Sequence, residues 1–213
     1  NGNIAPDGTS DTNAFLFALS NQGQRIWASL VSGPHSSVTP LLADVDGDGE
    51  VDILAWVASH HEGMHTNAHQ LEGRIVRLSR AGQELGSFRP DACVRDCATV
   101  ELDGDGSADV LALDCQGVLH LLTGQRDGGW RERARLACCK SPPPIERREL
   151  QVIGSIVGTG RFLPNDGLGV AVRSFVRHRF GEFNPGTAGQ SREDILLEHA
   201  RITVLNARLE EVA

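Results

Sequence analysis

Asp44-Val45-Asp46-Gly47-Asp48-Gly49-Glu50-Val51-Asp52 runs directly into an apolar segment, 53–57, and its near copy Glu101-Leu102-Asp103-Gly104-Asp105-Gly106-Ser107-Ala108-Asp109 runs into another, 110–113. We call these stretches loop 1 and loop 2. Each places acidic side chains at its first, third, fifth and ninth positions. Carboxylates packed so closely repel one another unless a cation lies among them. A hard divalent ion that takes about six to eight oxygen ligands, calcium above all, is the expected occupant.

Each loop lies inside a larger repeat that predicts β-strands. Pairs of short strands joined by a tight turn are predicted at 15–30, 74–88 and 118–136, and a fourth pair begins at 201–206. In the two middle copies a short apolar strand, the acidic loop and a strongly apolar strand precede the pair. The strand after each loop is almost unbroken in hydrophobicity, which is typical of a strand buried on both faces.

Four strands per unit is typical of β-propeller blades. We therefore predict an all-β chain, 1–213, that forms a single partial propeller domain of about three and a half to four blades. The blade-like units are expected at about 1–34, 35–90, 91–140 and 148–213. Because a closed propeller needs its first and last blades to meet, we expect further blades to come from missing residues or from another chain.

The last unit departs from the pattern. Its first two strands are predicted at 151–157 and 168–173, and the segment between them carries Asp166 as its one carboxylate, so no calcium is expected there. Residues 177–200 are predicted to form a long insertion, with a short helix at 191–199.

The EF-hand is the obvious alternative for the acidic loops, because its calcium loop also opens with D-x-D-x-D-G. An EF-hand needs a bidentate Glu at position 12 and a helix on each side. Position 12 is Ala55 in one loop and Ala112 in the other, and the flanking residues suit strands. The EF-hand interpretation is therefore rejected.

The loops and their flanks, Ala43–Leu54 and Val100–Leu111, resemble the FG-GAP or VCBS repeat family, whose members build β-propellers of the integrin α-subunit kind. The resemblance covers about 35–140 well and the rest loosely. It implies one calcium ion per loop, bound by the side chains of Asp44, Asp46, Asp48 and Asp52 or of Glu101, Asp103, Asp105 and Asp109. The seventh position, Glu50 or Ser107, would supply its backbone carbonyl. Glu101 stands where the family has Asp, so we expect the second site to hold its ion less well.

Composition excludes several classes of partner. The net charge of -8 argues against nucleic acid, because phosphate binding needs clustered Lys and Arg. No apolar run approaches the ~20 residues of a membrane-spanning helix, so no membrane insertion is expected. The chain begins with Asn1 and shows no signal-peptide pattern, so we expect a processed or partial chain.

The sequence holds five cysteines, and one or two disulfides are plausible, because Cys93 and Cys97 flank a short loop and Cys115 ends a predicted strand nearby. Such oxidation fits an extracellular, cell-surface or periplasmic home. Cys138 and Cys139 complete the set.

Nothing in the sequence requires an enzyme, since no GxSxG, HExxH or phosphate-loop motif is present. The histidine-rich stretch 60–69 is interpreted as a solvated insertion rather than a metal site. The leading hypothesis is a calcium-stabilised extracellular scaffold that binds a protein or glycan ligand through the connections at 58–72 and 174–200. One alternative is a polysaccharide lyase that uses Arg173, Arg177, His178 and Arg179, and another is a purely structural module of a larger surface protein.

Overall fold

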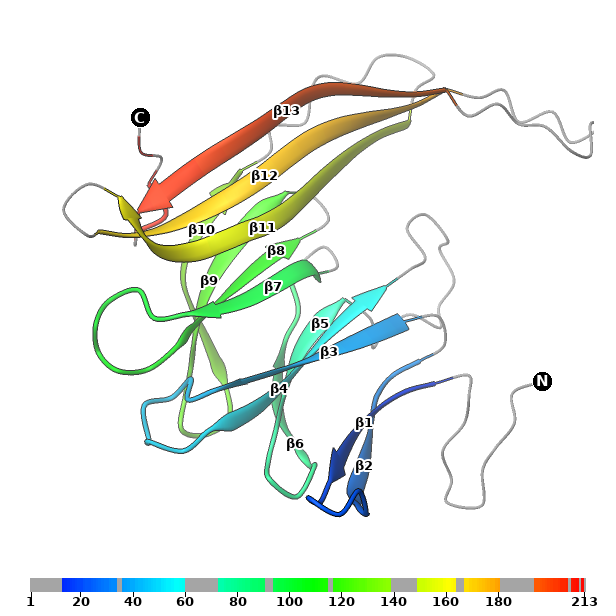
Figure 1. The fold of residues 1–213 in the computed structure, drawn as a ribbon, viewed down its shortest axis with the longest axis vertical. Coiled ribbons are helices and arrows are strands. Elements are labelled where there is room, and N and C mark those ends of the chain that lie inside the picture. The colour runs from blue at the N-terminus through cyan, green and yellow to red at the C-terminus, as the bar shows by residue number, and fades with distance from the viewer. Residues whose placement is uncertain are drawn as a thin grey trace, which may run out of the picture.

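The computed structural model describes residues 13–33, 36–59, 73–90, 94–114, 117–138, 149–163, 167–180, 194–206, 208–210 and 212. These residues form thirteen β-strands in four antiparallel sheets, and none of them is helical. The all-β prediction is therefore confirmed. The sheets follow one another along the long axis of the molecule, with β1 and β2 at one end and β11 to β13 at the other (Figure 1). No helix in this part of the chain is long and apolar enough to cross a membrane.

Strands that are consecutive in the chain are neighbours in every sheet, so each sheet is an antiparallel meander. The first sheet holds β1 (Ala14–Leu19) and β2 (Arg25–Ser32). The second holds β3 (Ser36–Ala43), β4 (Asp52–Ser59), β5 (Arg74–Leu78) and β6 (Glu84–Phe88). The third holds β7 (Val94–Val100), β8 (Asp109–Asp114), β9 (Val118–Gly124) and β10 (Trp130–Ala137). The fourth holds β11 (Glu149–Leu163), β12 (Gly167–Phe180) and β13 (Asp194–Asn206).

A separate apolar core lies between each pair of consecutive sheets. Strand β8 contributes to two of them, because Val110 and Ala112 pack toward the second sheet and Leu111 and Leu113 pack toward the fourth. Successive side chains of a strand point to opposite faces, so a strand between two cores must be apolar on both. All six residues of β8 are buried, which confirms the prediction for the strand that follows loop 2.

The tight turns repeat the same hydrogen bonds in all four sheets. In the first turn, Ser20 N donates to Gln24 O at 2.8 Å and Gly23 N donates to Ser20 O at 2.9 Å. The same two bonds close the turns at 79–83, 125–129 and 206–210. The fourth residue of each turn has a positive φ, and it is Gly23, Gly82, Gly128 or Leu209. Val212 N then donates to Val204 O at 2.9 Å, so a fourth hairpin does begin at the end of the chain.

Two of these turns rest on the last strand of the preceding sheet. A Cβ added at Gly82 would lie 2.7 Å from the Trp27 ring of β2, and one at Gly128 would lie 2.9 Å from the backbone oxygen of Leu85 in β6. Trp27 Nε1 also donates to Arg80 O at 2.7 Å. Glycine is therefore required twice at these turns, for the positive φ and for the close approach of two sheets.

The helix predicted at 191–199 is wrong where the structure describes it, because residues 194–199 belong to β13. Strand β12 continues to Phe180 instead of ending near Arg173, and it pairs with β13 through Arg177 and Leu197. The interstrand hydrogen bonds outweigh the helix propensity of Leu, Glu and Ala in this segment. The predicted insertion is correspondingly shorter, and its centre at 181–193 lies outside the described residues.

The predicted disulfide at Cys97 is also wrong, because Cys97 is a buried free thiol of β7. Burial, together with the nearby Asp96 carboxylate, raises the pKa of this thiol, so it stays protonated and unreactive. Cys93, Cys115 and Cys139 lie outside the described residues, and so does the histidine-rich stretch 60–69.

One buried histidine links three strands of the third sheet. His120 of β9 is 5% exposed, with Nε2 at 3.2 Å from Asp114 Oδ2 and Nδ1 at 2.8 Å from Glu132 Oε1. Its ring also meets the ring of Phe88 in β6 edge to face, at 5.5 Å between centroids. Burial lowers the pKa of His120, but the two carboxylates outweigh burial and raise the pKa above its ordinary value.

This histidine predicts a pH-dependent stability. Because the pKa is higher in the folded than in the unfolded state, its stabilising contribution is fully present below about pH 6.5 and is lost as pH rises through the folded-state pKa. Urea unfolding measured between about pH 5.5 and 9 should show this loss. The His120→Gln variant should flatten the dependence in that window, and a parallel loss in both proteins would contradict the assignment.

Candidate metal centre

Loop 1 joins β3 to β4 and loop 2 joins β7 to β8, so the two loops occupy the same connection in two sheets. The ninth residue of each loop is the first residue of the strand that follows. The glycines at the fourth and sixth positions all have positive φ, between 69° and 87°. Glycine adopts this left-handed backbone without steric cost, which lets the loop curl tightly.

The curled backbone of loop 1 holds the carboxylate of Asp44. Gly47 N donates to Asp44 Oδ1 and Gly49 N donates to Asp44 Oδ2, both at 2.8 Å. Asp48 Oδ1 in turn accepts a hydrogen bond from Glu50 N at 2.7 Å. The side chains at the first, third and fifth positions are thereby gathered on one side of the loop.

The structure brings three of the four predicted carboxylates together in each loop. One oxygen from each of Asp44, Asp46 and Asp48 lies within 4.8 Å of the others. Glu101, Asp103 and Asp105 form the matching group in loop 2, so the Glu in place of Asp does not break the pattern. Oxygen donors this close, drawn from three carboxylates, are the ligand type that calcium prefers.

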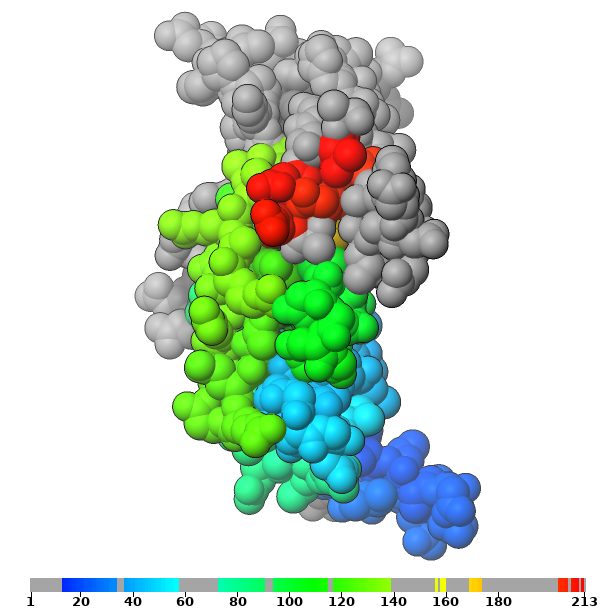
Figure 2. Space-filling model, turned by 90° about the vertical axis from the view of Figure 1, so that its left-hand side faces the viewer, coloured from blue at the N-terminus to red at the C-terminus, as the bar shows by residue number. Residues whose placement is uncertain are grey.

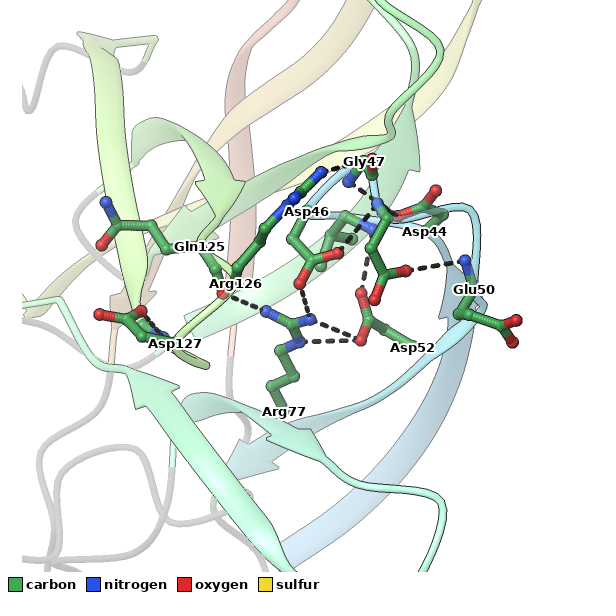
Figure 3. A network of polar contacts seen from close by, with 12 residues as sticks. Asp44, Asp46, Gly47, Glu50, Asp52, Arg77, Gln125, Arg126 and Asp127 are labelled. Carbon is green, nitrogen blue, oxygen red and sulfur yellow. Dashed lines mark hydrogen bonds and ion pairs between the residues drawn. The ribbon is translucent and has the colours of Figure 1, made fainter.

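The ninth-position carboxylate of loop 1 does not join that group, because an arginine binds it. Arg77 of β5 places Nε at 2.9 Å and Nη2 at 2.7 Å from Asp52 Oδ1, and Nη2 also lies 2.5 Å from Asp46 Oδ2 (Figure 3). The other oxygen of Asp52 accepts a hydrogen bond from Val45 N at 3.1 Å. The guanidinium of Arg77, which comes from β5, thus neutralises two carboxylates of loop 1.

Arg77 is a buried cation. Its side chain is 4% exposed, and burial opposes its charge, but the hydrogen bonds and charges of Asp46 and Asp52 outweigh burial and raise its pKa above the ordinary value. A buried charge needs partners for all its donors, and Arg77 Nη1 finds one in Gln125 O of the third sheet, at 2.6 Å. Loop 1 is therefore tied to β5 and to the neighbouring sheet by one side chain.

The third sheet makes further contacts with loop 1 because its β9–β10 hairpin is longer. Leu78 and Leu122 hold equivalent places in the pairing with β4 and β8, yet the turn starts one residue after Leu78 and three after Leu122. The two additional residues carry the turn over loop 1. Gly124 N donates to Val45 O at 2.9 Å, and a Cβ at Gly124 would lie 2.6 Å from the side chain of Val45.

Loop 2 has its own arginine, but a more exposed one on a different strand. Nη1 of Arg133 in β10 lies 2.7 Å from Asp103 Oδ2 and 2.9 Å from Asp109 Oδ1, and its side chain is 31% exposed. Thr123 Oγ1 also donates to Asp109 Oδ1 at 2.9 Å. Third and ninth positions are thus bridged by an arginine in both loops.

The second oxygen of Asp109 is buried and has no hydrogen-bond partner. Burial raises the pKa of Asp109 above its ordinary value, and Thr123 and Arg133 oppose that rise. A buried carboxylate oxygen without a partner is costly, and a bound cation would satisfy it. Loop 2 therefore offers three gathered carboxylates and, at the start of β8, one unpartnered oxygen of Asp109, which are donors of the type that a hard divalent ion takes.

The seventh-position residues behave differently from each other. The Glu50 side chain is exposed and pairs with Arg80, so it does not join the carboxylate group. Ser107 is buried, and its hydroxyl and backbone N–H both donate to Asp105 Oδ1, which lowers the pKa of Asp105 below its ordinary value. A backbone-carbonyl role for either residue stays a prediction.

Sequence reasoning missed Arg77 and Arg133. The sequence does carry a sign of Arg77, because this arginine interrupts the short apolar strand Arg74–Leu78, in which every residue is buried. An arginine in such a strand needs a carboxylate partner, and the nearest unexplained carboxylates are those of loop 1. Of the four residues considered for a lyase, Arg173 is exposed on β12, and the side chains of Arg177, His178 and Arg179 lie outside the described residues.

Comparisons with known proteins add little. No family model matches the chain, and no curated protein matches it. A search of solved structures finds the crystal structure of the V. cholerae biofilm matrix protein Bap1, with a TM-score of 0.34 and 12% sequence identity. The match covers 100% of this chain and 60% of that one, so this chain spans less than two thirds of that chain's length. A TM-score this low does not assign the two chains to one fold.

The two arginines make a matched pair for mutation. Arg77→Met should destabilise the fold by about 3 kcal/mol, because it leaves Asp46 and Asp52 with uncompensated charge in a buried setting. Arg133→Met should cost less than Arg77→Met, because Arg133 is itself 31% exposed and one of its two partners, Asp103, is partly solvated, although the other, Asp109, is buried. Urea unfolding in the presence of a chelator measures both. An equal loss of unfolding free energy in the two variants would show that the burial of Arg77 does not determine its contribution to stability.

Proposed function

We propose that the chain is part of an FG-GAP or VCBS-type β-propeller, in which loops 1 and 2 each hold one calcium ion. The observation that carries this proposal is the repetition of one arrangement. Two loops with the same spacing of carboxylates occupy the same connection in successive sheets and gather the same three positions within 4.8 Å. The unsatisfied oxygen of Asp109 supports it independently.

In this proposal calcium has a structural role. Asp44, Asp46 and Asp48 would hold the ion in loop 1, and Glu101, Asp103 and Asp105 would hold it in loop 2. A divalent ion would neutralise the carboxylates that Arg77 and Arg133 leave unpaired, and it would fix the connection between the first two strands of a sheet. The ion would thus brace the sheets, as the resemblance to integrin-type repeats implies.

The calcium loops occupy one end of the strands, which we call the braced end, and leave the opposite end for binding. In an antiparallel meander the first and third connections join strands at one end and the second connection joins them at the other. Loops 1 and 2 and the tight turns lie at the braced end, whereas the connections after β4 and β12 lie at the opposite end and are long, at 60–73 and 181–193. We propose that a protein or glycan ligand of an extracellular scaffold binds at this opposite end, since long loops on a rigid frame commonly carry function.

Calorimetry tests the calcium sites directly. Calcium should bind to two sites, and Asp46→Ala and Asp103→Ala should each remove one, because each deletes a carboxylate from one gathered group. Asp127→Ala, which removes an exposed acidic side chain from the β9–β10 turn, should leave both sites intact. At calcium near 100 times its dissociation constant, each site should add about 2.7 kcal/mol of stability. Absence of binding, or binding unchanged in both loop variants, would refute the proposal.

Replacement of the connection between β4 and β5 tests whether the ligand binds at the end opposite the calcium loops. Replacement of residues 61–71 by a short Gly-Ser linker should abolish capture of the chain on a glycan array or on immobilised matrix proteins. The calcium stoichiometry should stay unchanged, because loop 1 lies at the other end of the same strands. The matched control alters the braced end instead, by Arg80→Ala and Glu50→Ala, which together remove an exposed ion pair. Loss of capture in the Arg80→Ala and Glu50→Ala control alone would mean that the ligand binds at the braced end.

A further inference from the structure

The first sheet presents an apolar face that nothing in the described structure covers. Phe17 and Leu19 of β1 are 47% and 59% exposed, and Leu30 and Ile26 of β2 are exposed as well. Phe15 lies on the same face, with its ring centroid 6.1 Å from that of Phe17. The opposite face of this sheet is already used, because Leu16, Trp27 and Val31 pack against the second sheet.

The repeated turn shows which residues of the other sheets are equivalent to these. Leu19, Leu78 and Leu205 each lie one residue before the turn, and the pairing of β8 with β9 places Leu122 at the position of Leu78. Two residues earlier, the equivalents of Phe17 are Val76, His120 and Thr203. Strand β1 therefore occupies the place of β5, β9 and β13 in its own sheet.

In all three other sheets these positions are buried against the sheet that precedes them. Val76 and Leu78 belong to the core shared with the first sheet, Leu122 to the core shared with the second, and Leu205 to the core shared with the third. The three equivalents of Phe17 are between 0% and 5% exposed, and the three equivalents of Leu19 are between 0% and 2% exposed. Of the described sheets, the first alone exposes both positions, although Phe17 is larger and more apolar than His120 or Thr203 and Leu19 is a leucine like its three equivalents.

The edge of β1 is open in the same way. Strands β5, β9 and β13 each pair on one side with the second strand of their sheet, β4, β8 or β12. Strand β1 pairs with β2, and the described residues supply no strand on its other side. Figure 2 shows this two-stranded sheet projecting from one end of the molecule.

We propose that a fifth antiparallel β-sheet of the same repeat, from the same polypeptide, packs on the outer face of β1 through Phe17 and Leu19. The occupant would present an apolar face like those that meet Val76, Leu122 and Leu205 inside the stack. The inference continues an interface that the chain forms three times. It deepens the proposed function, because it locates where the propeller continues, but it does not depend on calcium.

Thiol labelling of two equally exposed positions tests the proposal. Phe17→Cys and Leu85→Cys each replace a side chain that is 47% exposed in the described structure, one on β1 and one on β6. The intact protein, as its source produces it, and the chain of residues 1–213 would each be treated with a maleimide. Peptide-resolved mass spectrometry separates the introduced thiols from the native cysteines, and thermal melting confirms that each variant is folded.

In the intact protein the introduced thiol of the Phe17→Cys variant should react at least about tenfold more slowly than that of Leu85→Cys, because a covering sheet protects it. In the chain of residues 1–213 the two should react alike. Equal rates in the intact protein would overturn the proposal. Protection already present in residues 1–213 would also overturn it, and the native mass would then assign the cover to a second copy or to residues 1–12. None of these outcomes depends on calcium binding, which the calorimetric experiment tests separately.

Discussion

The requirement that clustered carboxylates be neutralised governs the architecture of this chain. In loop 1 the guanidinium of Arg77 meets it for Asp46 and Asp52 and also reaches Gln125 in the β9–β10 turn of the next sheet. An uncompensated charge at that depth would cost several kcal/mol, so the arginine also dictates how β5, loop 1 and the β9–β10 turn are placed relative to one another. Loop 2 uses Arg133 from the outer strand β10 in the same way, and because this side chain is partly exposed, water also screens the charges there.

Local patterns predicted the strands and turns well. The hairpin at 74–88, for instance, is legible because apolar alternation flanks a turn whose glycine takes a positive φ. The gathering of Asp44, Asp46 and Asp48 was also predictable, since their spacing and the two glycines leave little choice of backbone. These features depend on residues close together in the sequence.

What depended on distant residues was missed. The segment at 194–199 has helix-forming residues, and only its pairing with β12 makes it a strand. The disulfide at Cys97 was inferred from spacing, whereas the strand β7 buries this thiol in the core between two sheets. Arg77 lies 25 positions from Asp52, so no local pattern joins them. Sequence reasoning therefore grouped four carboxylates in each loop where the structure gathers three, and it assigned their neutralisation to a metal alone.

The three separate cores bear on how the molecule responds to mechanical load. Each core described here joins two consecutive sheets, so stability is approximately a sum of sheet and nearest-neighbour terms, as in solenoid proteins. A force applied across one end would then be resisted mainly by a single interface at a time. The tie from Arg77 to Gln125 reinforces the interface between the second and third sheets. Removal of that tie should therefore lower the force at which the second and third sheets part.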